Sequence, residues 1–112
     1  MAQLKRPAKV KVLGKWVAIE YVPAGDILLR DSADDPDPGC GRSDGSKQSI
    51  AIEEGQPLAY EQDTVLHEVL HIIEDYMRMD VPEDVVDKFA TGLLAVLKDN
   101  PSFASYLRWR EK

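Results

Sequence analysis

Residues 64–77 read TVLHEVLHIIEDYM, and this stretch sets the pattern of the C-terminal half of the chain. At about 100° per residue its apolar side chains fall on one broad arc, which predicts an amphipathic helix from about Tyr60 to about Met79. His67 and His71 lie opposite that arc. Because they are four residues apart, their imidazoles project from one face of the helix, one turn apart.

A second helix is predicted directly after the first. Pro82 followed by two acidic residues is typical of a first helical turn, where proline is tolerated and the positive end of the helix dipole favours acids. Apolar residues then recur at helical spacing as far as Leu97, and Asn100-Pro101 ends the pattern. A short closing helix is expected over 102–110.

The residues before these helices have the pattern of strands. Val10–Val22 alternates in part and is rich in β-branched and aromatic residues, which predicts a hairpin around Gly14-Lys15. Residues 48–52 predict one further strand, and residues 31–46 between them predict a flexible acidic loop. The expected fold class is therefore α+β: a small antiparallel sheet, made of a hairpin plus an edge strand, followed by two helices.

Composition restricts the classes of protein that are possible. A chain of 112 residues predicts a single domain, 1–112, and 44% hydrophobic with 30% charged residues is ordinary for a globular protein. The net charge of −6 argues against a nucleic-acid partner, and no apolar run approaches the roughly 20 residues of a membrane span. The single cysteine excludes an intrachain disulfide. We therefore expect a cytoplasmic protein.

The chemistry of the chain is concentrated in the motif HExxH, residues 67–71. Both imidazoles can reach one metal ion from one helical face, and zinc, one ion per chain, is the expected cofactor. Glu68 lies beside the metal rather than among its ligands, where it can take a proton from water as a general base. The alternative is two solvated histidines without a metal.

Zinc hydrolases usually have three protein ligands, and no third histidine is present. Glu83 is the favoured third ligand, because it opens the second helix and a short turn can fold that helix back against the first. Asp87 lies one turn after Glu83 and can accept the second N–H of His67 or His71. It can equally be a solvated helix acid.

Two other residues remain as alternative ligands. Glu74 shares the helical face of the histidines, but three ligands along one straight helix converge poorly on a tetrahedral ion. Solvent exposure or a pair with Arg78 is the competing interpretation. Cys40, just before the predicted strand, offers a thiolate as a third or fourth ligand, or is a free loop thiol.

The segment Thr64–Leu94 resembles the small HExxH metallopeptidases of the zincin class with a glutamate third ligand (gluzincin type). The two nearest groups are the ImmA/IrrE-type domain and the minimal zincin-like proteins encoded by phages and prophages. In the first group, HExxH is followed by a glutamate that precedes Phe-Ala and Leu-Leu on the next helix. Here Glu83 precedes Phe89-Ala90 and Leu93-Leu94 in the same order.

This resemblance implies a minimal zincin-like fold with His67, His71 and Glu83 as ligands and Glu68 as the base. It also implies that an edge strand before the helix, here 48–52, pairs with an extended peptide or protein substrate. If the chain is phage-encoded, the host cytoplasm is its expected location.

The function expected from these observations is zinc-dependent hydrolysis of peptide bonds. The alternative is a non-catalytic zinc-binding regulatory or adaptor module that acts by protein–protein binding. A third interpretation is a closed structural zinc site, for which Cys40 would be the fourth ligand. Because no histidine is left to stabilise an oxyanion, a tyrosine would have to do so, and the candidates are Tyr21, Tyr60, Tyr76 and Tyr106.

Overall fold

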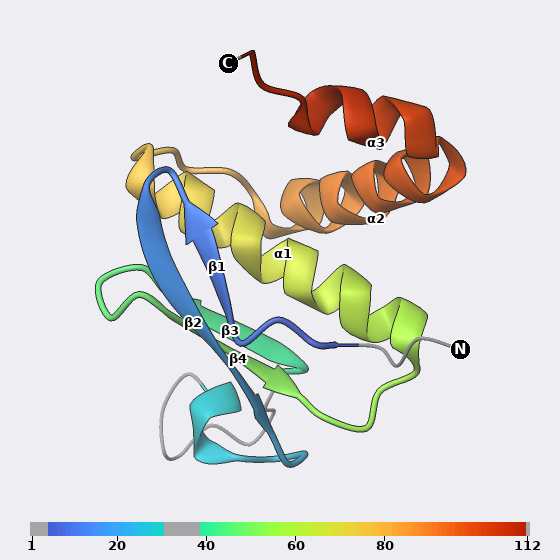
Figure 1. Ribbon diagram of the computed structural model, residues 1–112. Helices are drawn as coiled ribbons and strands as arrows, with labels where there is room; N and C mark the ends of the chain where they lie inside the picture. Colours follow the sequence, from blue (N-terminus) through green and yellow to red (C-terminus); the bar gives the residue numbers. More distant parts are fainter. Residues whose placement is uncertain (1–4, 31–38, 112) are drawn as a thin grey trace.

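The computed structural model describes residues 5–30 and 39–111, and within them it is an α+β protein (Figure 1). The elements, in chain order, are β1 (Lys9–Val12), β2 (Lys15–Val22), a 3₁₀ turn η1 (Ile27–Leu29), β3 (Gly41–Asp44), β4 (Ser49–Glu53), α1 (Leu58–Tyr76), α2 (Glu83–Asp99) and α3 (Pro101–Arg108). The predicted hairpin and the three predicted helices are therefore present.

The four strands form a mixed sheet in the order β1-β2-β4-β3. Two antiparallel hairpins, β1–β2 and β3–β4, are joined by a parallel pairing of β2 with β4. The prediction of an antiparallel sheet with 48–52 at its edge is wrong, because β4 is an interior strand. Its Ile50, Ala51 and Ile52 are all buried, as expected for a strand covered on both faces.

The edge position belongs instead to β3, which lies inside the segment 31–46 predicted to be a loop. Its sequence, GRSD, contains no apolar residue, so hydrophobic alternation could not reveal it. Backbone pairing with β4 and the turn that follows define it: the Asp44 carboxylate accepts from Ser46 N and Oγ (3.1 and 2.7 Å) and from Lys47 N (3.2 Å). The other part of the predicted loop, 31–38, lies outside the described residues.

The main core lies between one face of the sheet and α1, which crosses it (Figure 1). It consists of side chains from three strands and one helix: Val12, Val17, Ile19, Ile50, Ile52 and Ile72. Ala51 points to the opposite face of β4 and joins Val22 with Leu29 of η1 in a smaller cluster.

The turn between α1 and α2 reverses the chain. The structure ends α1 at Tyr76, three residues before the predicted end, and Arg78 takes a left-handed conformation (φ 55°). The reversal lays α2 beside α1, with α3 on the far side of α2 (Figure 1). Among the described residues, no helix is long and apolar enough to cross a membrane.

Candidate metal centre

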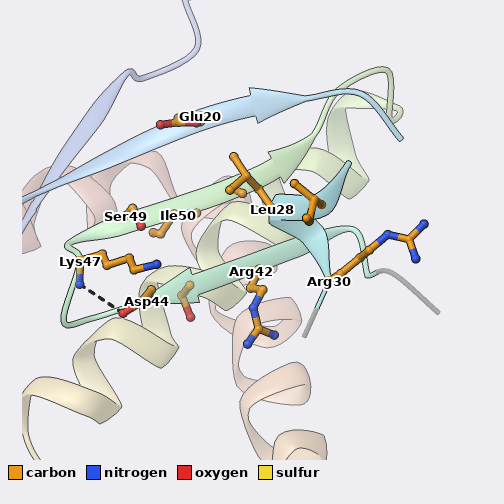
Figure 2. Close-up of a pocket in the computed structure, with 11 residues that line it drawn as sticks. Glu20, Leu28, Arg30, Arg42, Asp44, Lys47, Ser49 and Ile50 are labelled. Carbon is orange, nitrogen blue, oxygen red and sulfur yellow. Dashed lines mark hydrogen bonds between the residues drawn. The ribbon is translucent and has the colours of Figure 1, made fainter. Parts of the chain in front are cut away.

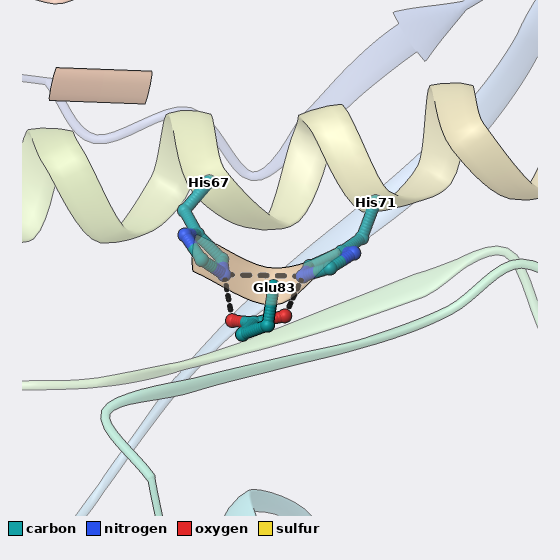
Figure 3. Close-up of side chains that lie close together, drawn as sticks. All are labelled: His67, His71 and Glu83. Atoms are coloured by element: carbon teal, nitrogen blue, oxygen red, sulfur yellow. Dashed lines mark hydrogen bonds and ion pairs between the residues drawn. The ribbon is translucent and has the colours of Figure 1, made fainter. Parts of the chain in front are cut away.

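Three side chains predicted to be ligands converge between α1 and the start of α2 (Figure 3). His67 and His71 project from one face of α1, and Glu83 is the first residue of α2. Glu83 Oε1 lies 2.6 Å from His67 Nε2, Oε2 lies 2.8 Å from His71 Nε2, and the two Nε2 atoms are 3.1 Å apart. Within residues 5–30 and 39–111, this is the single group of three or more His, Cys, Asp or Glu side chains whose ligand atoms all lie within 4.8 Å of one another.

The chemistry of these atoms fits a cation. The outer nitrogen of each imidazole faces a carboxylate: His71 Nδ1 lies 2.9 Å from Glu74 Oε1, and His67 Nδ1 lies 3.7 Å from Asp87 Oδ1. If each ring gives its Nδ1–H to that carboxylate, both Nε2 atoms carry lone pairs. Two lone pairs and a carboxylate then face one point, which is unfavourable unless a positive charge lies between them. Two imidazole nitrogens and one carboxylate are also a donor set typical of zinc.

The negative charges around His71 raise its pKa. Burial lowers its pKa, but the hydrogen bond to Glu74 and the charges of Glu83 and Glu68 outweigh burial, so the net shift is upward. A proton on His71 is thus one way in which the chain supplies the positive charge.

Glu74 contacts His71 from the side of the ring away from Glu83, so it lies outside the converging group. Its second oxygen, Oε2, accepts the Val81 N–H at 2.7 Å. This hydrogen bond and the one to His71 lower the pKa of Glu74. Val81 belongs to the turn before α2, and Glu83 is the first residue of α2. Glu74 therefore hydrogen-bonds both to the ring of His71 and to the turn that positions Glu83. None of the ion pairs between described residues joins Glu74 to Arg78.

Glu68 is buried, with 6% of its surface exposed, between α1 and β3. Burial raises its pKa, while His67, a hydrogen bond from Ser43 and His71 act in the opposite direction. Gly41 allows β3 to approach this closely: a Cβ there would lie 2.6 Å from Thr64 Cγ2 and 3.1 Å from Glu68 Cγ. The carboxylate therefore lies beside the histidines, at the position that the sequence predicts for a base.

A cleft of about 400 Å³ opens beside the three converging side chains, lined by Gly41, Arg42, Ser43, Glu68, His71 and Glu83. Arg42 also lines a hollow of about 370 Å³ formed by η1, β3 and β4 (Figure 2). Sequence reasoning missed Ser43 and Arg42, because their position depends on a strand that no hydrophobic pattern predicts.

None of the four tyrosines considered for the oxyanion lines this cleft. The Tyr21 hydroxyl donates to Pro7 O at 2.8 Å, and the Tyr76 hydroxyl lies 3.5 Å from Gly45 O. Tyr60 and Tyr106 are largely exposed. The cationic side chain that lines the cleft is Arg42.

Cys40 lies apart from the converging group. It is exposed, and burial of part of its thiol together with neighbouring Glu53 raises its pKa. A raised pKa disfavours the thiolate that zinc binds. Among the described residues, the converging group therefore consists of His67, His71 and Glu83 without Cys40.

Comparison with family models, with curated proteins and with solved structures found no match to this chain.

Proposed function

We propose that the chain is a zinc-dependent peptidase in which His67, His71 and Glu83 hold the metal and Glu68 is the general base. The observation that carries the proposal is the convergence of His67 Nε2, His71 Nε2 and both Glu83 carboxylate oxygens within 3.1 Å of a neighbour in the group. Three protein ligands leave one tetrahedral position for water, the arrangement of a catalytic rather than a structural site.

Each residue then has a defined task. A zinc ion bound here would lower the pKa of a coordinated water to about 7 and polarise a substrate carbonyl. Glu68 takes the proton of the attacking water and returns it to the departing amine. Its burial favours this exchange, because a carboxylate with a raised pKa holds the proton long enough to pass it on. Glu74 and Asp87 hold the imidazole rings in place.

The substrate strand is proposed to pair with β3 rather than with 48–52. Both sides of β4 are taken by β2 and β3, so its backbone cannot accept another strand. In the described part of the chain β3 has a neighbour on one side only. An extended peptide added to its outer edge would run past Ser43 and Arg42, beside Glu68.

The test begins with metal content, measured by elemental analysis on full-length protein purified without a chelator or a histidine tag. We expect about one zinc per chain, and loss of that zinc in His71→Ala. A His67→Ala variant, measured at the same protein concentration, should also lose the zinc. Zinc that survives both substitutions would contradict the assigned ligands.

The second part of the test is hydrolysis of a mixed peptide library by the zinc-loaded protein, followed by mass spectrometry. We expect cleavage that stops on chelation and returns when zinc is added. A chain that binds one zinc and cleaves no peptide would overturn the peptidase assignment and favour a binding module.

A further inference from the structure

A second apolar surface lies on α2, beside the stripe that packs against α1. Helix α1 covers Val86 and Ala90, which are 4% and 0% exposed. A neighbouring stripe on α2, here called the α2 apolar face, comprises Val85, Phe89, Leu93 and Val96. Phe89, Leu93 and Val96 are 61%, 42% and 45% exposed. A surface helix needs one apolar stripe, so the second stripe calls for a partner.

The α2 apolar face contains both a projection and a hollow. Phe89 stands out from it, whereas Gly92 leaves a space in which a Cβ would meet nothing within 4 Å. The hollow around Gly92 has a volume of about 460 Å³ and is lined by Val85, Lys88, Phe89, Gly92, Leu93 and Val96. A side chain the size of Phe89 on another copy can enter such a hollow, as ridges enter grooves between packed helices.

Two charged residues beside the α2 apolar face are placed so that they could pair across a two-fold axis. Lys88 and Asp99 are exposed and eleven residues apart, roughly three helical turns, so they lie along the same edge of α2. Neither forms an ion pair with any residue in the described ranges. When two copies of α2 pack antiparallel with Leu93 near the two-fold axis, Lys88 of each copy lies opposite Asp99 of the other. The same register places Phe89 against Val96.

We propose that the α2 apolar face binds the same face of a second copy of this chain, forming an antiparallel, two-fold symmetric dimer. Such an interface is isologous: Leu93 meets its own equivalent, and every other contact occurs twice. The opposed helix dipoles also favour the antiparallel arrangement. The proposal stands independently of the metal centre, because none of its residues is a ligand or the base.

The available surface is sufficient for a dimer of moderate stability. Met79, 51% exposed, extends the apolar area towards α1, where it lines a hollow shared with Phe89 and Leu93. We take about 150–200 Å² for each fully exposed large side chain. On that basis the exposed parts of four side chains amount to roughly 350 Å² of apolar surface per copy: Met79, Phe89, Leu93 and Val96. Since apolar atoms make up a little over half of a typical interface, the whole contact would bury about 1,200 Å² across both copies, the lower end of the specific range.

The test is sedimentation equilibrium of the full-length protein over a wide range of micromolar concentrations. We expect a monomer–dimer equilibrium, weakened roughly hundredfold or more by Leu93→Arg, because both copies carry the change at the axis. Ile27→Ser, at an apolar residue of η1 that is 63% exposed, is the matched control and should leave the equilibrium unchanged. Circular dichroism checks that each variant is folded.

Charge reversal tests the register. Lys88→Glu and Asp99→Lys should each weaken the dimer by roughly three- to tenfold, because each creates two like-charge contacts, and the double variant should recover the original affinity. Both sites are exposed, so folding is not at stake. A monomer at every concentration would overturn the proposal. A dimer that responds equally to Ile27→Ser and Leu93→Arg, or whose single charge reversals are not rescued by the double variant, would also overturn it.

Discussion

Helix α1 buries one carboxylate in its N-terminal third and another in its middle, and the two have different kinds of neighbours. Glu61 is 3% exposed, and Arg6 Nε lies 2.8 Å from both of its oxygens. Glu68 is 6% exposed, and among the described residues its neighbours are the hydroxyl of Ser43 and two imidazoles, with no arginine or lysine ion pair. One carboxylate lies beside the permanent positive charge of a guanidinium, whereas the other lies beside a hydroxyl and two imidazoles.

If Glu68 is the base proposed above, this difference separates a structural from a chemical use of the same residue type. A buried carboxylate paired with a guanidinium holds two segments together, here the chain before β1 and the start of α1. A buried carboxylate without such a partner has a raised pKa, because burial disfavours its charged form. Substitutions at the two sites should therefore affect different properties.

The largest expected effect is on hydrolysis. Glu68→Gln should retain zinc and lose roughly three orders of magnitude in turnover, because removal of a general base typically costs 10²–10⁴-fold. The matched control is Glu61→Gln, two turns away on the same helix, which should keep its turnover at a temperature at which it is folded. If the two variants lost activity equally, the distinction between the carboxylates would be wrong.

A third carboxylate of α1 refines the comparison. Glu74→Gln should weaken zinc binding about 10- to 100-fold, because its hydrogen bond to His71 Nδ1 measures 2.9 Å and partners of this kind contribute by that factor. Asp87→Asn should have a smaller effect, since the corresponding distance to His67 is 3.7 Å. Competition with a chelating dye measures both affinities. The reverse order of effects would show that the ring of His67, not of His71, limits binding.

Stability should follow the opposite order to activity. Glu61→Gln should lower the melting temperature of the metal-free protein by several degrees, because Arg6 loses the carboxylate that both its contacts require. Glu68→Gln should leave the melting temperature unchanged or raise it, since a neutral amide costs less to bury than a carboxylate. A combined Arg6→Met, Glu61→Leu variant should regain much of the loss. A larger drop for Glu68→Gln than for Glu61→Gln would contradict this assignment.

The smallest expected effect concerns Cys40. Cys40→Ser should leave both zinc content and melting temperature unchanged, because the thiol lies outside the converging group. Release of zinc or unfolding on this substitution would instead indicate a closed site with a fourth protein ligand.

The two helices that carry the candidate site are predicted well by the sequence, because their determinants are local. The spacing of His67 and His71 requires only the helical period, and Pro82 with Glu83 marks the start of α2 at the residue where the structure begins it. The distance from Glu83 to the histidines follows from one short chain reversal. Each of these features is encoded within a few residues.

The parts that could not be predicted depend on contacts between distant segments. The edge strand β3 has no apolar residue, and its pairing with β4 shows only in the assembled sheet. The roles of Ser43 and Arg42 follow from that pairing. Glu74 was considered as a ligand because its helical face is correct, but its contact with Val81 depends on the path of the turn. The spacing of residues in the sequence predicts which side chains share a face of a helix or strand, but not which distant residues that face contacts.

The parallel pairing of β2 with β4 has a consequence for how the chain folds. The hairpins β1–β2 and β3–β4 each close over a few residues, whereas their junction pairs Ala18 with Ser49 and Val22 with Glu53, far apart in the chain. Hairpins form within about 1–10 μs, and non-local strand pairing is slower because more chain entropy is lost before contacts compensate for it. We therefore expect the β2–β4 junction to form in the rate-limiting step. The cleft beside Glu68 depends on a different contact, because Gly41 of β3 lies directly against Thr64 and Glu68 of α1. It therefore needs the β3–β4 hairpin to pack on α1, and not the β2–β4 junction itself.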